Sequence, residues 1–239
     1  GVPVLSYHKV EGNFSNALAI GVNEFEEQMA YLHKKGYTTI SPEQLYNYLK
    51  KGTPLPPKPV LITFDDGYRD NFVNAYPILK KYGFKAAIFL ITDAIGGNND
   101  RYLTWEQAIE MRRKGFSFGT HTLSHVELSG VSEDYAMFQL EKSQEAAEWR
   151  FDAPVKYFAY PGGAYNSNIE TLVEKAGYKA AFSTEFGRVT KTSDIYALER
   201  IPIFRSWFTF ADFYFRLNFT NVVSGLKMTK GYVWQSKSN

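Results

Sequence analysis

Short β-rich runs alternate along this chain with amphipathic stretches that end at glycine, and this alternation constrains the fold more than any other feature. The runs are almost continuously apolar, as expected of parallel strands that are buried on both faces. We read residues 60–64, 86–91, 116–120, 157–160 and 180–183 as strands, after a first strand within residues 2–7. Repeated strand–helix alternation predicts an α/β fold with a parallel sheet, either closed as a barrel or open and doubly wound.

Helix boundaries are marked by polar caps and by glycines. Ser41-Pro-Glu-Gln and Thr104-Trp-Glu-Gln have the capping-box pattern that begins a helix, and Gly52 and Gly115 stand where these two helices should end. Further helices are expected at residues 24–35, 71–81, 133–149 and 168–175. The proline-rich residues 53–59 predict a stiff connection rather than a domain linker. We therefore expect residues 1–239 to form a single domain.

Composition excludes several classes of function. With 239 residues, 44% of them hydrophobic, the chain can bury a large core. Lys and Arg number 27 and Asp and Glu 25, so no basic field would hold a nucleic acid. Cysteine is absent, which leaves any metal to nitrogen and oxygen ligands. No apolar run approaches the roughly 20 residues of a membrane span. We therefore expect neither a nucleic acid partner nor a transmembrane segment in this chain, and the sequence leads us to infer no protein partner.

Two of the 4 histidines, His121 and His125, follow directly after the expected strand at residues 116–120. In α/β folds the loops at the carboxyl ends of the strands form the active site. Residues four apart on a helical turn share one face, so both imidazoles could ligate one ion. The alternative is a pair of solvated loop histidines.

Two adjacent carboxylates, Asp65 and Asp66, end the buried strand in Leu61-Ile-Thr-Phe-Asp-Asp-Gly. Neighbouring strand residues point to opposite faces, so the two carboxylates can share a site only where the pleat breaks, near Gly67. Two turn-forming or helix-capping aspartates are the alternative.

One carboxylate and two imidazoles form a three-ligand site that leaves positions for water and substrate, as expected of a catalytic ion. The second carboxylate is then available as a base. The same ligands also suit non-haem iron oxygenases, so they do not define the reaction. A glycosidase that uses Asp65 and Asp66 is disfavoured, because such carboxylate pairs flank a bond at about 5 Å or more and usually come from separate elements.

These motifs resemble those of the polysaccharide deacetylases, the NodB-homology family or carbohydrate esterase family 4. Thr63-Phe-Asp-Asp-Gly67 is similar to the first motif of the family, and His121-Thr-Leu-Ser-His125 to the second. The resemblance extends from Leu5-Ser-Tyr-His8 to Arg200-Ile-Pro-Ile203 and implies a distorted (β/α) barrel with fewer than eight regular repeats. It also implies that Asp65 is the base and that Asp66, His121 and His125 bind one divalent ion, with zinc as the default.

The third motif departs from the family pattern. Phe158-Ala-Tyr-Pro-Gly-Gly163 is similar to the family's loop, but Ala159 stands where many members have the arginine that orients the base. We expect Arg200 to replace that arginine, with a surface ion pair as the alternative. Backbone N–H groups around Gly162 could stabilise the oxyanion, because glycine lets the main chain approach closely. A plain turn is the alternative there.

A second departure concerns the catalytic acid. Many members place a histidine in a late Leu-x-His segment, whereas no histidine follows His125 in this chain. His8 ends the first strand and would lie at the same mouth of a barrel as the aspartates. Its Tyr-His ending resembles the subgroup that acts on the poly-N-acetylglucosamine of biofilms, which implies the acid role for His8. A structural histidine is the alternative.

The resemblance thus implies metal-dependent hydrolysis of N-acetyl groups from an N-acetylglucosamine-containing polysaccharide, with poly-N-acetylglucosamine favoured. Peptidoglycan or chitin oligomers are alternative substrates, and a non-catalytic carbohydrate-binding relative is the alternative to an enzyme. Tyr160, Trp105 and Trp207 are candidates to stack on sugar rings, with core or rim positions as the alternative. The family also implies an extracellular or cell-surface location.

Overall fold

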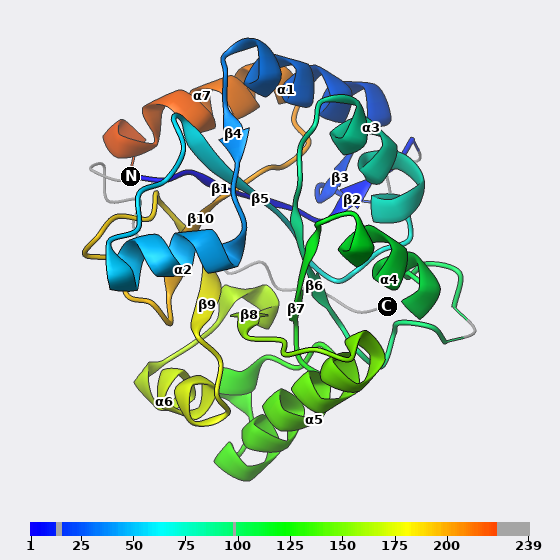
Figure 1. The fold of residues 1–239 in the computed structure, drawn as a ribbon, viewed down its shortest axis with the longest axis vertical. Helices are drawn as coiled ribbons and strands as arrows, with labels where there is room; N and C mark the ends of the chain where they lie inside the picture. Colours follow the sequence, from blue (N-terminus) through cyan, green and yellow to red (C-terminus); the bar gives the residue numbers. More distant parts are fainter. Residues whose placement is uncertain (13–15, 98, 224–239) are drawn as a thin grey trace.

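Seven parallel strands close into a barrel in the computed structural model, which describes residues 1–12, 16–97 and 99–223 (Figure 1). The barrel strands are β1 (Val4–Tyr7), β5 (Pro59–Phe64), β6 (Ala87–Leu90), β7 (Ser117–Thr120), β8 (Tyr157–Ala159), β9 (Ala180–Phe186) and β10 (Leu198–Pro202). Their order around the barrel is β1, β10, β9, β8, β7, β6 and β5, and β5 pairs back onto β1. The predicted barrel, rather than the open sheet, is therefore the observed fold.

Closure of the barrel depends on a long-range pairing between β1 and β5. The register aligns Val4 with Leu61 and Tyr7 with Phe64, over the whole length of β1. A short strand, β4 (Thr38–Thr39), pairs with the start of β5 outside the closed ring. Two further short strands, β2 (Lys9–Val10) and β3 (Ala19–Ile20), form a separate sheet.

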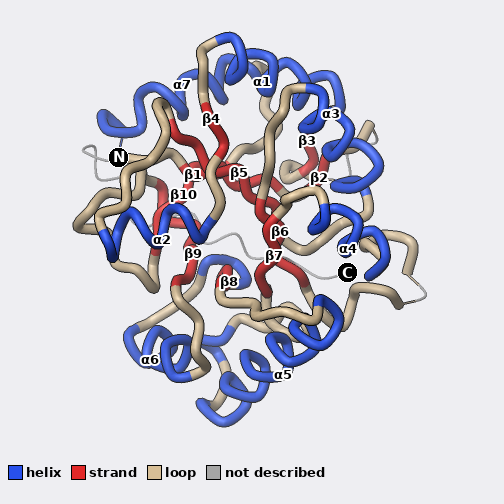
Figure 2. Tube along the Cα trace, viewed as in Figure 1, coloured by secondary structure: helices blue, strands red, loops and turns tan. Residues whose placement is uncertain are grey.

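Helices cover the outside of the barrel (Figure 2). They are α1 (Val22–Lys34), α2 (Pro42–Lys51), α3 (Tyr76–Lys81), α4 (Trp105–Arg113), α5 (Glu133–Phe151), α6 (Ser167–Lys175) and α7 (Thr209–Val223). Both predicted capping boxes are confirmed, since the Ser41 and Thr104 hydroxyls each accept a hydrogen bond from the third residue of their helix. None of the helices in the described part of the chain has the length and apolar character needed to span a membrane.

One helix has no counterpart among the predicted ones. α7 lies beside α1 (Figure 1), where Tyr31 packs edge-on against Phe210 and Phe213. The apolar residues of α7 are distributed around most of the helix, so its sequence lacks the one-sided period that marks a surface helix.

The helix predicted at residues 71–81 is interrupted. Its first part, Asn71–Ala75, is a π-helical turn that precedes α3. In this turn the side-chain amides of Asn71 and Asn74 donate hydrogen bonds to the carbonyl oxygens of His8 and Val10, at 2.8 and 2.7 Å. Such π-turns often occur at functional sites, and this one fixes the backbone that follows β1.

Alternation along the strands separates the barrel interior from the surface beneath the helices. Leu61, Phe89 and Phe182 belong to one buried cluster, which fills the barrel, whereas Ile62, the neighbour of Leu61, packs in a second cluster with helix residues. Gly119 of β7 also faces inward. A Cβ at this position would lie 2.6 Å from the Phe89 ring, so glycine makes room for a large interior side chain.

The same alternation directs polar side chains toward one end of the barrel. Asp65 continues the inward-facing positions of β5, as His8 does for β1 and His121 for β7. Arg200 lies two residues after the inward-facing Leu198 in β10. Because the strands are parallel, their carboxyl ends meet at one mouth, and these side chains converge there.

Candidate active site

Three predicted metal ligands lie together at the carboxyl ends of β5 and β7. Asp66 Oδ1 is 3.5 Å from His121 Nε2 and 3.4 Å from His125 Nε2, and the three ligand atoms all lie within 4.8 Å of one another. Asp66 Oδ1 is buried and accepts no hydrogen bond from the described residues. Ligand atoms at about 2.0–2.1 Å from a tetrahedral ion are roughly 3.4 Å apart. These donors therefore fit a divalent metal.

His121 is prepared as a neutral ligand. Its Nδ1 lies 2.7 Å from the carbonyl oxygen of Ala159, and because a carbonyl only accepts, Nδ1 carries the proton and Nε2 keeps its lone pair. Burial lowers the pKa of His121, against the opposing effect of Asp65 and Asp66. The low pKa favours the neutral imidazole that metal binding requires.

Asp66 reaches the histidines because the chain turns sharply after β5. Asp66 has a φ of 73° and Gly67 a φ of 77°, so the pleat breaks where the sequence predicted. A Cβ on Gly67 would lie 2.7 Å from the Leu90 side chain, which makes glycine necessary at this turn. Because of this break, the side chains of Asp65 and Asp66 both lie at the same end of the barrel, although neighbouring residues of a regular strand point to opposite faces.

Asp65 is bound by a fully buried arginine. Nη1 and Nη2 of Arg200 donate to Oδ1 and Oδ2 of Asp65 at 2.7 and 2.8 Å, and Arg200 Nε donates to the Ser183 carbonyl oxygen at 2.7 Å. Arg200 is 0% exposed. Burial would raise the pKa of Asp65, but the charge and hydrogen bonds of Arg200, together with nearby His121 and His8, hold it well below its ordinary range. The carboxylate therefore stays ionised.

His8 approaches the same carboxylate from β1. Its Nε2 is 3.9 Å from Asp65 Oδ2, and its side chain is 17% exposed, so a molecule at the mouth can reach it. Its Nδ1 is buried and makes no hydrogen bond to the described residues. The amide of Asn71, which is buried, holds the backbone of His8 through its carbonyl oxygen.

Gly162 lies in the loop after β8, where it has a φ of 64°. A Cβ on Gly162 would lie 2.7 Å from Glu127 Oε1. The left-handed backbone favours glycine at this position, and a larger residue would also displace the Glu127 carboxylate.

The structure separates the three candidates for sugar stacking. Tyr160 is fully buried and donates its hydroxyl to the Tyr196 carbonyl oxygen, and Trp105 is 6% exposed against Phe151, so neither ring has a face open to a sugar. Tyr160 and Trp105 are therefore core residues, which was the alternative to sugar stacking. Trp207, by contrast, is 99% exposed on the segment that follows β10.

Some groups that shape the site leave no side-chain signal in the sequence. The carbonyl oxygens of Ala159 and Ser183 bind His121 and Arg200, and every residue offers a carbonyl. Only the fold shows which carbonyls are used.

Tyr68 is a further residue at the site, directly after the Asp-Asp-Gly motif. Its ring stacks on Tyr102 with centroids 5.2 Å apart. Burial, and then the negative charge of Asp66, raise the pKa of Tyr68. Its position next to the motif is a sequence signal that could have identified it.

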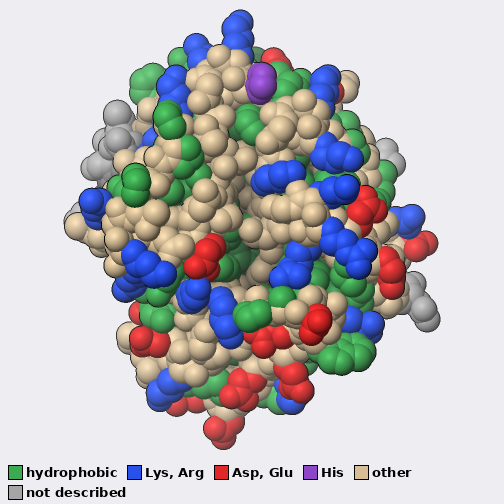
Figure 3. Space-filling view, in the orientation of Figure 1, with side chains coloured by type: hydrophobic (Ala, Val, Ile, Leu, Met, Phe, Trp, Pro, Cys, Tyr) green, Lys and Arg blue, Asp and Glu red, His purple; other side chains and the backbone are tan. Residues whose placement is uncertain are grey.

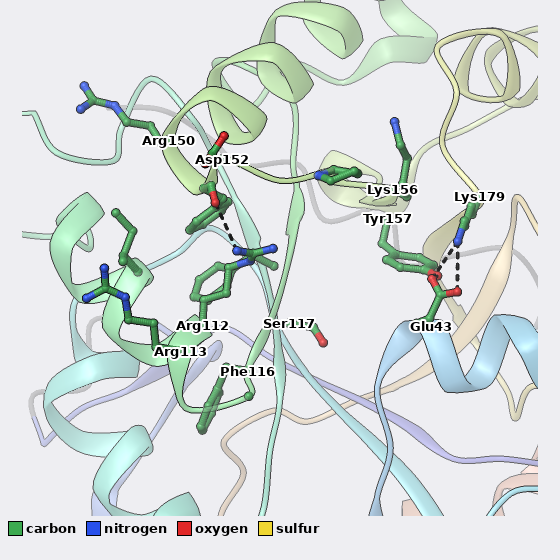
Figure 4. A pocket seen from close by; sticks show the side chains of 15 residues that line it. Glu43, Arg112, Arg113, Phe116, Ser117, Arg150, Asp152, Lys156, Tyr157 and Lys179 are labelled. Atoms are coloured by element: carbon green, nitrogen blue, oxygen red, sulfur yellow. Dashed lines mark hydrogen bonds and ion pairs between the residues drawn. The ribbon is translucent and has the colours of Figure 1, made fainter.

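A separate pocket of about 610 Å³ lies at the opposite end of the strands (Figure 4). Its lining includes Ser117, Lys156 and Lys179, which stand at or just before the starts of β7, β8 and β9. Lys and Arg side chains surround the hollow on this face (Figure 3). Lys179 contacts Glu43 there at 2.9 Å. Residues at this amino-terminal end of a parallel barrel are expected to contribute to stability rather than to catalysis.

Comparison with known proteins agrees with this geometry. Residues 52–181 match the polysaccharide deacetylase family. The poly-beta-1,6-N-acetyl-D-glucosamine N-deacetylase of Staphylococcus aureus (strain NCTC 8325 / PS 47) is 32% identical over 225 residues, covering 83% of this chain and 77% of that protein. YxkH of Bacillus subtilis (strain 168), named as a polysaccharide deacetylase, is 38% identical over 202 residues, covering 84% and 71%.

Solved structures show the same barrel. The Streptococcus pyogenes deacetylase PplD, in complex with acetate, superposes with a TM-score of 0.81 at 30% identity, over 85% of this chain and 92% of that one. IcaB from Ammonifex degensii superposes with a TM-score of 0.79 at 25% identity, over 90% and 97%. Sequence, fold and site agree that this chain belongs to the polysaccharide deacetylases of carbohydrate esterase family 4 and is a polysaccharide N-deacetylase.

Proposed function

We propose that this enzyme removes N-acetyl groups from β-1,6-linked poly-N-acetylglucosamine, with Asp65 as the base and His8 as the acid. The observation that carries these roles is that Arg200 and His8 both lie next to the carboxylate of Asp65. Asp65 is held by both terminal nitrogens of Arg200, lies 3.9 Å from His8, and neighbours the ligand Asp66. The 32% identity with the Staphylococcus aureus enzymes of that name supports the substrate.

Asp66, His121 and His125 would hold the divalent ion, and we propose zinc because a site of one carboxylate and two imidazoles suits it. When bound, such an ion supplies Lewis-acid polarisation of the acetyl carbonyl and of water. The hydrogen bond from His121 to Ala159 orients one ligand, and Asp66 Oδ1 accepts no hydrogen bond from the part of the chain that the structure describes, so both can bind the ion.

Hydrolysis of the amide needs one proton removed from water and one proton given to nitrogen. Asp65 accepts the first as the water oxygen bonds to the acetyl carbon, and Arg200 keeps this carboxylate ionised and oriented. His8, in its protonated form, donates the second as the carbon–nitrogen bond breaks. The products are acetic acid and the sugar amine, which become acetate and an ammonium group when the acid gives its proton to the amine. The proton on Asp65 returns to His8 through solvent.

The negative oxygen of the tetrahedral intermediate needs donors of its own. We assign this role to backbone N–H groups around Gly162, because glycine has no side chain to keep a ligand away from the main chain.

Trp207 is the proposed sugar-stacking residue. The chain between β10 and Trp207 is tied to the mouth, since the Ile203 N–H donates to the Ser6 carbonyl oxygen and the Arg205 N–H to that of Ala17, both at 2.9 Å. We expect Trp207→Ala to raise KM for acetylated oligomers about two- to tenfold, the loss of one aromatic contact. Trp149→Ala, which removes another exposed tryptophan from the outside of α5, is the matched control and should leave KM unchanged.

The substrate is tested by acetate release from β-1,6-linked oligomers, from β-1,4-linked chitin oligomers and from peptidoglycan. The β-1,6-linked oligomers should give the highest kcat/KM. Faster release from chitin oligomers or peptidoglycan would contradict the proposed substrate and identify one of those polymers instead, but it would leave the proposed deacetylation chemistry unchanged. Release from none of the three would contradict the proposed function.

A further inference from the structure

Gln139 of α5 is a buried polar residue whose side chain leaves its own helix and contacts the metal-ligand loop, residues 121–125. It is 1% exposed. Its Oε1 accepts hydrogen bonds from the backbone N–H groups of Leu123 and Ser124, both at 3.1 Å. Its Nε2 donates to Ser124 Oγ at 3.0 Å and to Tyr135 Oη at 3.1 Å. Two backbone donors on one atom fix which end of the amide is the oxygen.

The loop needs such support because its backbone is unfavourable. Thr122 and His125 have φ values of 63° and 62°, in the left-handed region that side chains other than glycine avoid. Leu123 and Ser124, between them, present N–H groups that require acceptors. Gln139 supplies one acceptor for both.

The two histidine ligands differ in how they are held. His121 is 2% exposed and is fixed through its own ring by the Ala159 carbonyl oxygen. The His125 side chain is 46% exposed, so its position depends more on the backbone that carries it. Gln139 binds the backbone N–H groups of Leu123 and Ser124, the two residues that precede His125.

We propose that Gln139 is a positioning residue that holds the metal-ligand loop, and His125 above all, in the metal-binding geometry before the ion arrives. The proposal rests on the metal role assigned to Asp66, His121 and His125. An amide is suited to the task because it accepts from the loop backbone and donates to Ser124 Oγ at the same time. Removal of groups that orient metal ligands typically lowers metal affinity by roughly 10- to 100-fold, and we expect an effect of this size because Gln139 holds the residues between the two histidines.

The test measures Zn²⁺ and Co²⁺ affinity by titration into chelator-stripped protein, with the visible absorption of bound Co²⁺ as a second readout. Wild-type protein that binds no stoichiometric metal would contradict the metal site itself. Given wild-type binding, Gln139→Met should weaken affinity about 10- to 100-fold and alter the Co²⁺ spectrum. Gln139→Glu, which keeps the acceptor, should remain within about threefold of wild type and restore most of kcat.

The matched control is Gln144→Met in the same helix. Gln144 is also buried, but its Nε2 donates to the Val155 carbonyl oxygen, away from the metal loop. Gln144→Met should lower the melting temperature of the metal-free protein without changing metal affinity. The proposal is overturned if Gln139→Met binds metal as Gln144→Met does, or if Gln139→Glu loses as much affinity as Gln139→Met. Should Gln139→Met fail to fold, Gln139→Ala replaces it in both comparisons, with the same expected loss of metal affinity.

Discussion

Arg200 and Asp65, which are 135 residues apart in the sequence, form a two-pronged salt bridge at the mouth of the barrel. Many members of the family orient their base with an arginine on the loop where this chain has Ala159. Here the orienting arginine comes from a barrel strand, and its Nε is bound to the Ser183 carbonyl oxygen of the neighbouring strand. Orientation of the proposed base, Asp65, is therefore built into the barrel rather than into a loop.

Asp65→Asn should bind metal like the wild type and lose activity. The amide keeps the shape of the side chain but cannot accept the proton of water, so kcat should fall by about 10²- to 10⁴-fold. Acetate release and metal stoichiometry are measured on the same sample. Asp66→Asn is the control and should lose metal as well as activity. An Asp65→Asn protein with full metal and full acetate release would refute the base assignment.

Arg200→Met should be the most destabilising single change at the site. It leaves the buried carboxylate of Asp65 without its cation, and breaking a buried pair in this way costs about 3–5 kcal/mol. Urea unfolding of the metal-free protein measures the loss. The double variant Asp65→Asn with Arg200→Met should recover part of it, because no unpaired charge remains. Equal loss in the single and double variants would mean that packing, and not charge, explains the role of Arg200.

The same pair predicts how stability depends on pH. The pKa of Asp65 is depressed in the folded state relative to its ordinary value of 3.8, so the pair's contribution is fully present above that value. As the pH falls below it toward the depressed pKa, the unfolded state takes up the proton first and the contribution is lost. Asp65→Asn should flatten the fall in unfolding free energy below about pH 4. An unchanged slope would contradict the depressed pKa.

His8→Gln should separate the acid role from the rest of the chemistry. Without a proton donor, loss of the sugar amine should slow by about 10²- to 10³-fold, while metal binding stays unchanged. An activated ester such as 4-nitrophenyl acetate has a leaving group that needs no proton. Its hydrolysis should therefore be nearly unaffected, and an equal loss on amide and ester would argue that His8 is structural.

Much of the fold could be predicted from the sequence because it is encoded locally. The capping residues Ser41 and Thr104 begin their helices as predicted, and the apolar run before Asp65 is a barrel strand. Barrel closure was not encoded in this way, because it depends on the pairing of β1 with β5, more than fifty residues later. From the residues alone, both the closed barrel and the open sheet were possible.

In the site, too, the features encoded in short motifs could be predicted, whereas those that depend on long-range contacts could not. Asp66, His121 and His125 lie in short motifs at strand ends, and the structure brings them together. The burial of Tyr160 and Trp105 could not be read from their type, since aromatic rings serve cores and sugar sites equally well. Gln139 was invisible because its partners are backbone N–H groups 15 and 16 residues away.

The most direct test of the account is acetate release from a β-1,6-linked N-acetylglucosamine oligomer by wild-type protein before chelation, after chelation and after reloading with one equivalent of Zn²⁺. We predict one free amine for each acetate released, loss of activity in the stripped protein, and recovery on reloading. Water that no ion polarises has a pKa of about 15.7, far above that of a carboxylate, so Asp65 alone cannot remove its proton efficiently. Undiminished acetate release from fully metal-free protein, or new reducing ends without acetate, would contradict the account.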